Sequence, residues 1–68
     1  MFRLNIQTGN AAFAGDPGAE VARIIRELAG HIASLSGDGN EIDDGGNVFD
    51  RNGNRVGTWS LDTSEETP

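Results

Sequence analysis

One amphipathic segment constrains the fold of this chain more than any other feature of its sequence. Its aliphatic residues recur at intervals of three and four, at Val21, Ile24, Ile25, Leu28, Ile32 and Leu35. This spacing places their side chains on one stripe of a helix, and predicts a helix over residues 17–36. Asp16 is a favoured N-cap residue, Pro17 suits the first helical position, and Gly37 stands where a helix can end. A stripe this wide requires an apolar partner surface from the rest of the chain.

The segment before the helix has the pattern of a strand followed by a loop. Apolar residues alternate with polar ones from Phe2 to Gln7, which is the period of a strand with one buried face. Residues 8–15 contain glycine and asparagine and are predicted to form a loop. Within this loop, we expect Phe13 to cover one end of the helix.

The segment after the helix is predicted to contain a hairpin over residues 47–61. Asn52-Gly53 lies at its centre, and this dipeptide is a strong signal for a hairpin turn. A two-residue type I′ loop would pair Phe49 with Val56. A type I turn with a glycine bulge would pair Val48 with Val56 instead, and we favour this bulged form.

These elements predict an α+β domain in β-α-β-β order over residues 1–61, followed by a flexible polar tail over residues 62–68. The helix packs on a three-stranded sheet, and the C-terminal hairpin is antiparallel. One helix covers one sheet face, so the other face and at least one edge strand remain open. The expected core holds either Phe2 or Leu4, one of Phe49 or Trp59, and Ile6, Val21, Ile24, Ile25, Leu28, Ile32, Leu35 and Val56.

Length and charge narrow the possible functions. A chain of 68 residues without cysteine has room for one small core and has no disulfide or cysteine-based zinc site. The formal net charge is −6, and the whole excess of negative charge falls in residues 37–68. Direct nucleic-acid binding is disfavoured, because phosphates require a basic surface. An acidic surface suits a basic partner, or serves solubility alone. We find no apolar run of about 20 residues and no signal peptide, and therefore expect a cytoplasmic protein.

Residues 37–47 are glycine-rich and acidic, and we interpret them as a mobile loop. The carboxylates of this loop and the single tryptophan are the candidate binding residues: Asp38, Glu41, Asp43, Asp44 and Trp59. Trp59 either caps the core that faces the helix or anchors an interface on the open sheet face. The sequence leaves both positions open.

Two further features of the sequence bear on metal binding and on catalysis. Asp50-x-Asn52-x-Asn54 resembles the start of a calcium loop, but Arg55 and Leu61 occupy the positions that require Gly and Glu, so a simple turn is preferred. The single histidine, His31, lies one turn after Glu27 and is expected to form a surface pair with it. Since the sequence places no nucleophile beside His31, we predict no catalytic residue, no metal, no cofactor and no enzymatic activity.

Four segments carry a resemblance to a known group of proteins, and they are Leu4-Asn5-Ile6, Thr8 to Phe13, Glu20 to Arg26 and Asp50 to Trp59. Over residues 2–61 the chain resembles small proteins encoded by bacteriophages and prophages. Such proteins run through a strand, an N-A-A-F loop, a helix and a D-x-N-G-N-x-V-G hairpin. Most members have no assigned function, so the resemblance transfers no catalytic residue.

The resemblance implies a viral setting in the host cytoplasm. In that setting small acidic proteins often bind and block host machinery, including defence complexes. We therefore expect a binding protein that blocks a host factor, such as a CRISPR-type nucleoprotein complex, by presenting acidic surface where nucleic acid would bind. The alternative is a self-associating structural or accessory module without inhibitory activity. Dimerisation is favoured for so short a chain, with Trp59 or Phe49 buried across a two-fold axis.

Overall fold

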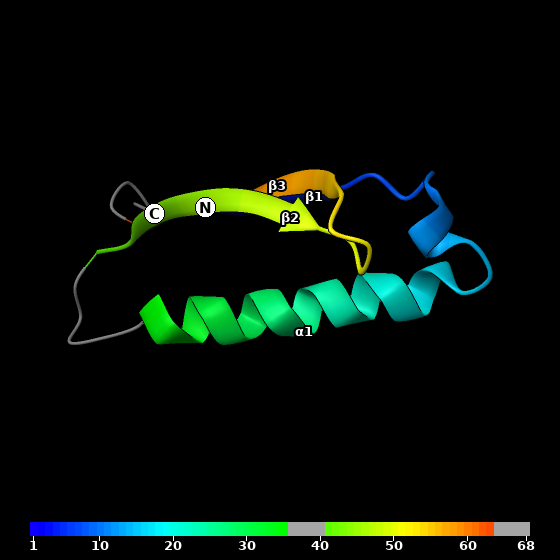
Figure 1. Ribbon diagram of the computed structural model, residues 1–68. Coiled ribbons are helices and arrows are strands. Elements are labelled where there is room, and N and C mark those ends of the chain that lie inside the picture. Colours follow the sequence, from blue (N-terminus) through cyan, green and yellow to red (C-terminus); the bar gives the residue numbers. More distant parts are fainter. Residues whose placement is uncertain (36–40, 64–68) are drawn as a thin grey trace.

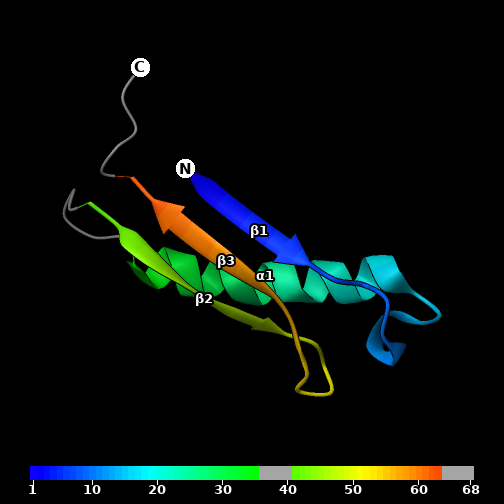
Figure 2. The ribbon, with the colours of Figure 1, turned by 90° about the horizontal axis from the view of Figure 1, so that it is seen from above.

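The computed structural model describes residues 1–35 and 41–63, which form one antiparallel sheet and one long helix. The elements, in chain order, are β1 (Phe2–Ile6), the short 3-10 helix η1 (Ala11–Phe13), α1 (Pro17–Leu35), β2 (Asp43–Phe49) and β3 (Arg55–Asp62). The strand order is β1-β3-β2, with α1 crossing one face of the sheet (Figures 1 and 2). The α+β fold predicted from the sequence is confirmed.

The helix begins where the sequence predicts it to begin. The Asp16 Oδ1 atom accepts a hydrogen bond from the backbone N–H of Ala19 at 3.0 Å, which is the geometry of an N-cap. The described part of the helix ends at Leu35, and Gly37 lies outside the described residues.

The hairpin turn has the bulged form that we favoured. The N–H of Gly53 donates to the Asp50 carbonyl at 3.0 Å, and the N–H of Asp50 donates to the Asn54 carbonyl at 2.9 Å. Gly53 adopts a positive φ of 86°, which a type I turn with a glycine bulge requires at this position.

A second irregularity in the hairpin shifts the register that we expected. Phe49 lies opposite Arg55, but Val48 lies opposite Gly57, so Val56 is an extra residue on β3. Both pairings predicted for Val56 are therefore wrong. The turn residues set the register only as far as Phe49.

The bulge decides which side chains of β3 enter the core. Val56 and Trp59 are three residues apart and would face opposite sides of a regular strand. Because the bulge intervenes, both side chains are buried on the side of the helix, with Trp59 only 6 % exposed. Phe49 is 51 % exposed, so of these two aromatic residues it is Trp59 that belongs to the core.

The segment 43–47 is part of strand β2, and the prediction of a mobile loop is wrong there. Gly45 and Gly46 pair with Ser60 and Trp59 on β3. A Cβ atom on Gly45 would lie 2.7 Å from the Trp59 carbonyl oxygen, and one on Gly46 would lie 3.2 Å from Trp59 Nε1. The two glycines therefore allow the strand to approach Trp59 closely, and they do not mark a turn.

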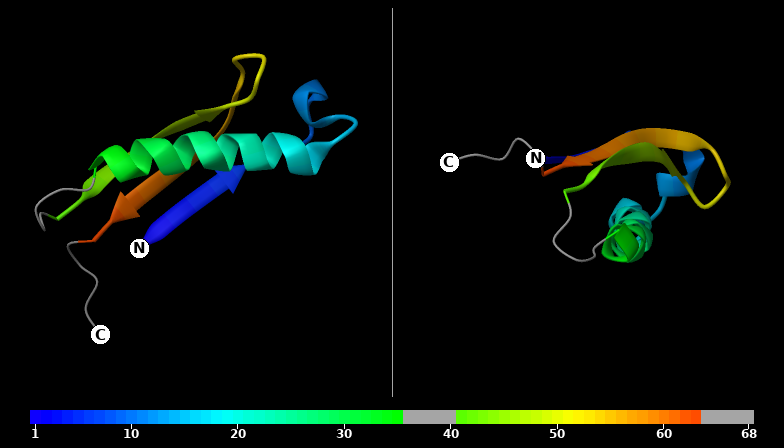
Figure 3. Two further views of the ribbon diagram at one scale, coloured as in Figure 1. Left: turned by 90° about the horizontal axis from the view of Figure 1, so that it is seen from below. Right: turned by 90° about the vertical axis from the view of Figure 1, so that its left-hand side faces the viewer.

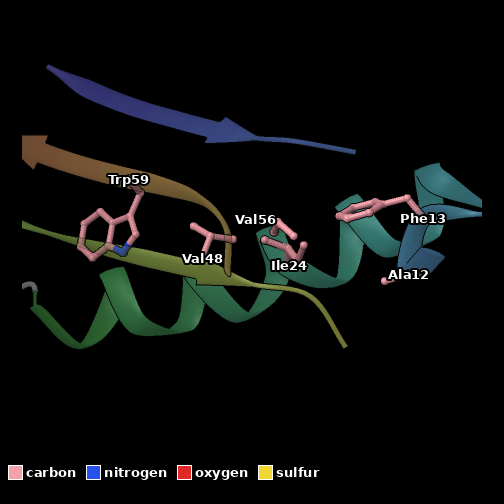
Figure 4. Close-up of a cluster of buried hydrophobic side chains, with 6 residues drawn as sticks. All are labelled: Ala12, Phe13, Ile24, Val48, Val56 and Trp59. Atoms are coloured by element: carbon pink, nitrogen blue, oxygen red, sulfur yellow. The ribbon is translucent and has the colours of Figure 1, made fainter. Parts of the chain in front are cut away.

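The core lies between the sheet and the helix, and continues under η1 (Figure 4). Its buried side chains are Ala12, Phe13, Ile24, Val48, Val56 and Trp59, and those packed against them are Leu4, Ile6, Val21, Leu28, Ile32, Leu35 and Leu61. Leu4 rather than Phe2 contributes from β1, and Phe13 lies beside the start of the helix as expected. Ile25 was wrongly assigned to the core: it is 47 % exposed, because the apolar stripe is wider than the surface that the sheet covers.

The ordered structure continues past residue 61. Asp62 is the last residue of β3, and its N–H donates to the Met1 carbonyl at 3.0 Å. The N–H of Thr63 donates to the Ile42 carbonyl at 2.9 Å. The predicted polar tail therefore does not include residues 62 and 63, and residues 64–68 lie outside the described part.

Burial predicts unequal effects for substitutions at a core residue, Ile24, and at a half-exposed residue, Phe49. Ile24→Ala removes atoms from a side chain that is 4 % exposed, and is expected to lower the free energy of unfolding by about 2–5 kcal/mol. Phe49→Ala removes more atoms but is expected to cost less, because half of that ring already contacts water. Urea unfolding of both variants measures the difference, and a larger loss for Phe49→Ala would contradict this assignment of the core.

Candidate functional site

The predicted acidic residues lie at the beginning of β2, except for Asp38, which is outside the described residues. Glu41, Asp43 and Asp44 are all exposed. Asp43 and Asp44 are neighbours on a strand, so their side chains point to opposite sides of it. Among residues 1–35 and 41–63, no three His, Cys, Asp or Glu side chains gather in a way that could hold a metal ion.

Trp59 occupies the centre of the sheet on the side of the helix. It lies opposite Leu4 on β1 and opposite Gly46 on β2. The ring of His31 from α1 meets the indole edge to face, with 5.5 Å between ring centroids and 77° between planes. Of the two positions that the sequence left open for Trp59, the structure shows the one in the core that faces the helix, and not the one on the open sheet face.

A cleft of about 350 Å³ runs between α1 and β2. Figure 4 shows Trp59, Val48 and Ile24 pointing from three elements into the space beneath the sheet. The wall formed by Gly45 and Gly46 is backbone only, because neither residue has a side chain. The cleft is lined by the apolar residues Ile24, Leu28, Val48, Phe49 and Trp59 and by the polar residues Glu27, His31 and Asn47.

The charged group at this cleft is fixed by an ion pair. The Glu27 carboxylate bonds the guanidinium of Arg23, which also donates to Glu20 through Nε and Nη2, each at 2.9 Å. Glu27 was expected to pair with His31, but His31 packs on Trp59 instead. An apolar cleft with the Glu27 carboxylate in its lining suits an apolar side chain flanked by a positive charge.

A second, wholly apolar groove lies on the other side of α1, next to β1, with a volume of about 500 Å³. Phe2 and Ile25 stand at its mouth and are 46 % and 47 % exposed. The groove is lined by Phe2, Leu4, Ile25, Leu28, Ala29, Ile32 and Ala33. Sequence reasoning missed this surface, because it assigned Ile25 to the core. The available signal was the width of the stripe, which exceeds what three strands cover.

Two buried carboxylates, Asp50 and Glu20, connect the hairpin turn to the loop before α1 and to the first turn of α1. Asp50 accepts hydrogen bonds from the N–H groups of Asn52 at 2.8 Å and Asn54 at 2.9 Å, and from Nδ2 of Asn10 at 2.8 Å. Asn10 in turn accepts the N–H of Ala12 at 2.9 Å and so caps η1. These bonds join the loop before the helix to the hairpin turn, and they bear out the turn interpretation of the Asp50 motif.

Glu20 is the second of these carboxylates. Besides its bidentate pair with Arg23, it accepts the backbone N–H of Arg51 at 2.8 Å. The bond joins the first turn of the helix to the hairpin turn. Asn10, Glu20 and Asp50, which belong to the segments that carry the phage-protein resemblance, therefore have structural roles as a cap and as links between loops.

Both carboxylates are held in the charged form. Burial raises the pKa of Asp50, but the hydrogen bonds from Asn54, Asn10 and Asn52 outweigh burial and leave that pKa below its ordinary value. The hydrogen bond from Arg23 lowers the pKa of Glu20, and it prevails over the opposing effect of burial. Groups with lowered pKa values remain ionised at neutral pH and serve as hydrogen-bond acceptors.

These pKa shifts predict a loss of stability in acid. A carboxylate with a lowered pKa stabilises the fold above its unfolded pKa of about 4, and that contribution is lost as the pH falls through the folded value. Asp50→Asn is expected to lower the melting temperature at neutral pH. The introduced side-chain NH2 group would face the NH2 group of Asn10, so that two donors meet where Asp50 now supplies an acceptor. Between neutral pH and pH 3, the melting temperature of the variant should fall less than that of the wild type, as measured by thermal melts. Parallel acid losses in the two proteins would contradict the role of Asp50.

Comparisons with protein-family models, with curated proteins and with solved structures find no match for this chain. The resemblance to phage proteins therefore rests on the motifs quoted above. Within the residues that the structure describes, no helix is both long and apolar enough to span a bilayer.

Proposed function

We propose that this chain is a small acidic binding protein of a bacteriophage or prophage that blocks a host factor in the host cytoplasm. The target would be a basic surface, such as the nucleic-acid channel of a CRISPR-type defence complex. The protein would act by occupying that surface, without a catalytic residue, metal or cofactor of its own. The phage setting is supported by the sequence resemblance, and the mode of action by the surface of β2.

The observation that carries this proposal is the separation of two kinds of carboxylate. Glu20 and Asp50 are buried and bonded within the fold. Asp43 and Asp44 are exposed on an edge strand, where they contribute to no core contact. The core does not use this second pair, and exposed carboxylates on one strand attract a partner of the opposite charge.

The lining of the cleft beside β2 favours a protein as the partner and not a simple ion. Its apolar lining gives an arriving side chain a surface to bury, while Glu27 and the exposed carboxylates favour a basic neighbour of that side chain. Phe49, half-exposed at this cleft, is a suitable aromatic contact. A lysine- or arginine-rich protein surface provides both kinds of group.

Removal of the exposed carboxylates tests the proposal. Asp43→Asn/Asp44→Asn is expected to slow association with the partner several-fold and to change dissociation little, because long-range attraction acts mainly on encounter. Asn at position 44 retains the acceptor for the Gly45 N–H, which Asp44 Oδ1 binds at 2.8 Å. The partner is first captured from host lysate and identified by mass spectrometry. Its association rate is then measured at two ionic strengths.

The matched control is Glu65→Gln/Glu66→Gln, which makes the same change in net charge outside the described residues. It should slow association less than the β2 variant, and raised salt should slow the wild type. Salt-independent association, or equal effects of the two variants, would contradict a specific role for the β2 carboxylates.

A further inference from the structure

We propose that two copies of this chain form a two-fold symmetric dimer by pairing their β1 strands in antiparallel orientation. The result is a six-stranded sheet in which each copy covers the apolar groove beside the other's β1 and α1. This surface differs from the one expected from the sequence, which was centred on Trp59 or Phe49, since Trp59 is buried within each copy and Phe49 lies on β2 at the other edge of the sheet. The inference does not depend on the proposed blocking function.

The outer edge of β1 presents its backbone groups for pairing. Met1 and Asp62 exchange hydrogen bonds across β1 and β3, so in an antiparallel ladder the even-numbered residues of β1 direct their N–H and C=O groups outward. These residues are Phe2, Leu4 and Ile6. In the described segments, β3 is the only strand paired with β1, and the outer edge of β1 carries no further strand (Figure 2).

The other edge of the sheet is better protected. On β2, the outward N–H of Gly45 is bonded to Asp44 Oδ1 at 2.8 Å. The Phe49 carbonyl accepts a contact from Arg23 Nη2 at 3.4 Å. Side chains that satisfy an edge in this way discourage further strand addition. Strand pairing between copies is therefore expected at β1.

The sequence of β1 is complementary to itself. With the two-fold axis at Leu4, the Leu4 residues of the two copies lie opposite each other and Phe2 lies opposite Ile6. This register uses the same backbone groups that face outward. It places all the apolar side chains on the helix side, and on the open face it sets Arg3 opposite Asn5, so that no like charges meet directly.

The groove supplies the apolar surface that such a dimer buries. Figure 3 shows α1 on one side of the sheet only, so pairing of the β1 strands places both helices on the same side. Phe2 and Ile25, each about half-exposed, lie beside the axis and extend the core of each copy through Leu4 and Leu28. The short side chain of Ala29 lets the second copy approach.

Charge also favours a second copy at this edge. The groove is lined without a charged residue, although the chain carries a net charge of −6. The strand order becomes β2-β3-β1-β1-β3-β2, so Asp43 and Asp44 of the two copies lie at the far edges of the sheet. Repulsion between the acidic strands is thereby reduced, and the cleft beside each β2 stays open.

Sedimentation equilibrium of the full chain, from micromolar to millimolar concentration, tests the dimer. Ile25→Glu is expected to raise the dimer dissociation constant about 30-fold or more, as the loss of a central apolar contact does. Ala29→Glu should act in the same direction, and covers the case that Ile25→Glu fails to fold. Phe49→Ser, which removes a similarly exposed apolar side chain on β2, should leave the dimer dissociation constant unchanged.

Hydrogen exchange identifies the strand that pairs. The amides of Leu4 and Ile6 should be protected in the wild-type dimer and should exchange rapidly in Ile25→Glu. The amides of Arg3 and Asn5 bond β3 within one copy and should remain protected in both proteins. A wild type that stays monomeric overturns the proposal. So does a dimer weakened only by Phe49→Ser, or one in which Leu4 and Ile6 exchange freely.

Discussion

The packing of the Trp59 indole against Gly46 determines how the other elements of this small domain are placed. The ring lies in the middle of the sheet, where the largest side chain of the chain needs a neighbour with no side chain at all. The bulge at Val56 turns a second apolar residue to the same side. His31 then meets the ring from the helix, which leaves a cleft on one side of α1 and an apolar groove on the other.

The capping and turn preferences of residues close together in the sequence predicted the parts of the fold that depend on short-range contacts. The N-cap at Asp16, the start of the helix at Pro17 and the glycine bulge at Gly53 each depend on residues within a few positions, and each was predicted. Gly45 and Gly46 were misinterpreted as a loop because their role depends on Trp59, which is distant in the sequence. No local turn signal in the sequence predicts the extra residue at Val56. The bulge instead follows from tertiary packing, because it lets the side chains of Val56 and Trp59 both enter the core on the helix side.

The candidate surfaces were predictable only in part, for the same reason. The sequence identified Asp43 and Asp44 as candidate binding carboxylates and Asp50 as a turn residue, but it did not show that Glu20 and Asp50 are buried in hydrogen-bond networks. It identified the amphipathic stripe, but it could not show that Ile25 lies beyond the area that the sheet covers. Whether a residue at the margin of the helix stripe is buried depends on how wide the sheet is, and the spacing of apolar residues along the helix does not give that width.

The two sheet edges differ in chemistry, and this difference links the fold to the proposals about function. The β2 edge combines carboxylates with a partly apolar cleft, and its outward Gly45 N–H is already bonded. The β1 edge is apolar on the helix side and has unbonded outward groups within the described structure. A chain with one edge suited to its own copy and one suited to a basic partner can associate through both at once.

The central claim is the position of Trp59, and nuclear Overhauser contacts of its indole protons test it most directly. The structure predicts contacts from the indole to the Hα protons of Gly46 and to the ring of His31. It also predicts an emission maximum typical of a tryptophan shielded from water. Indole contacts to the side chains of Arg3 and Asn5 on the open face, together with water-exposed emission, would contradict the account.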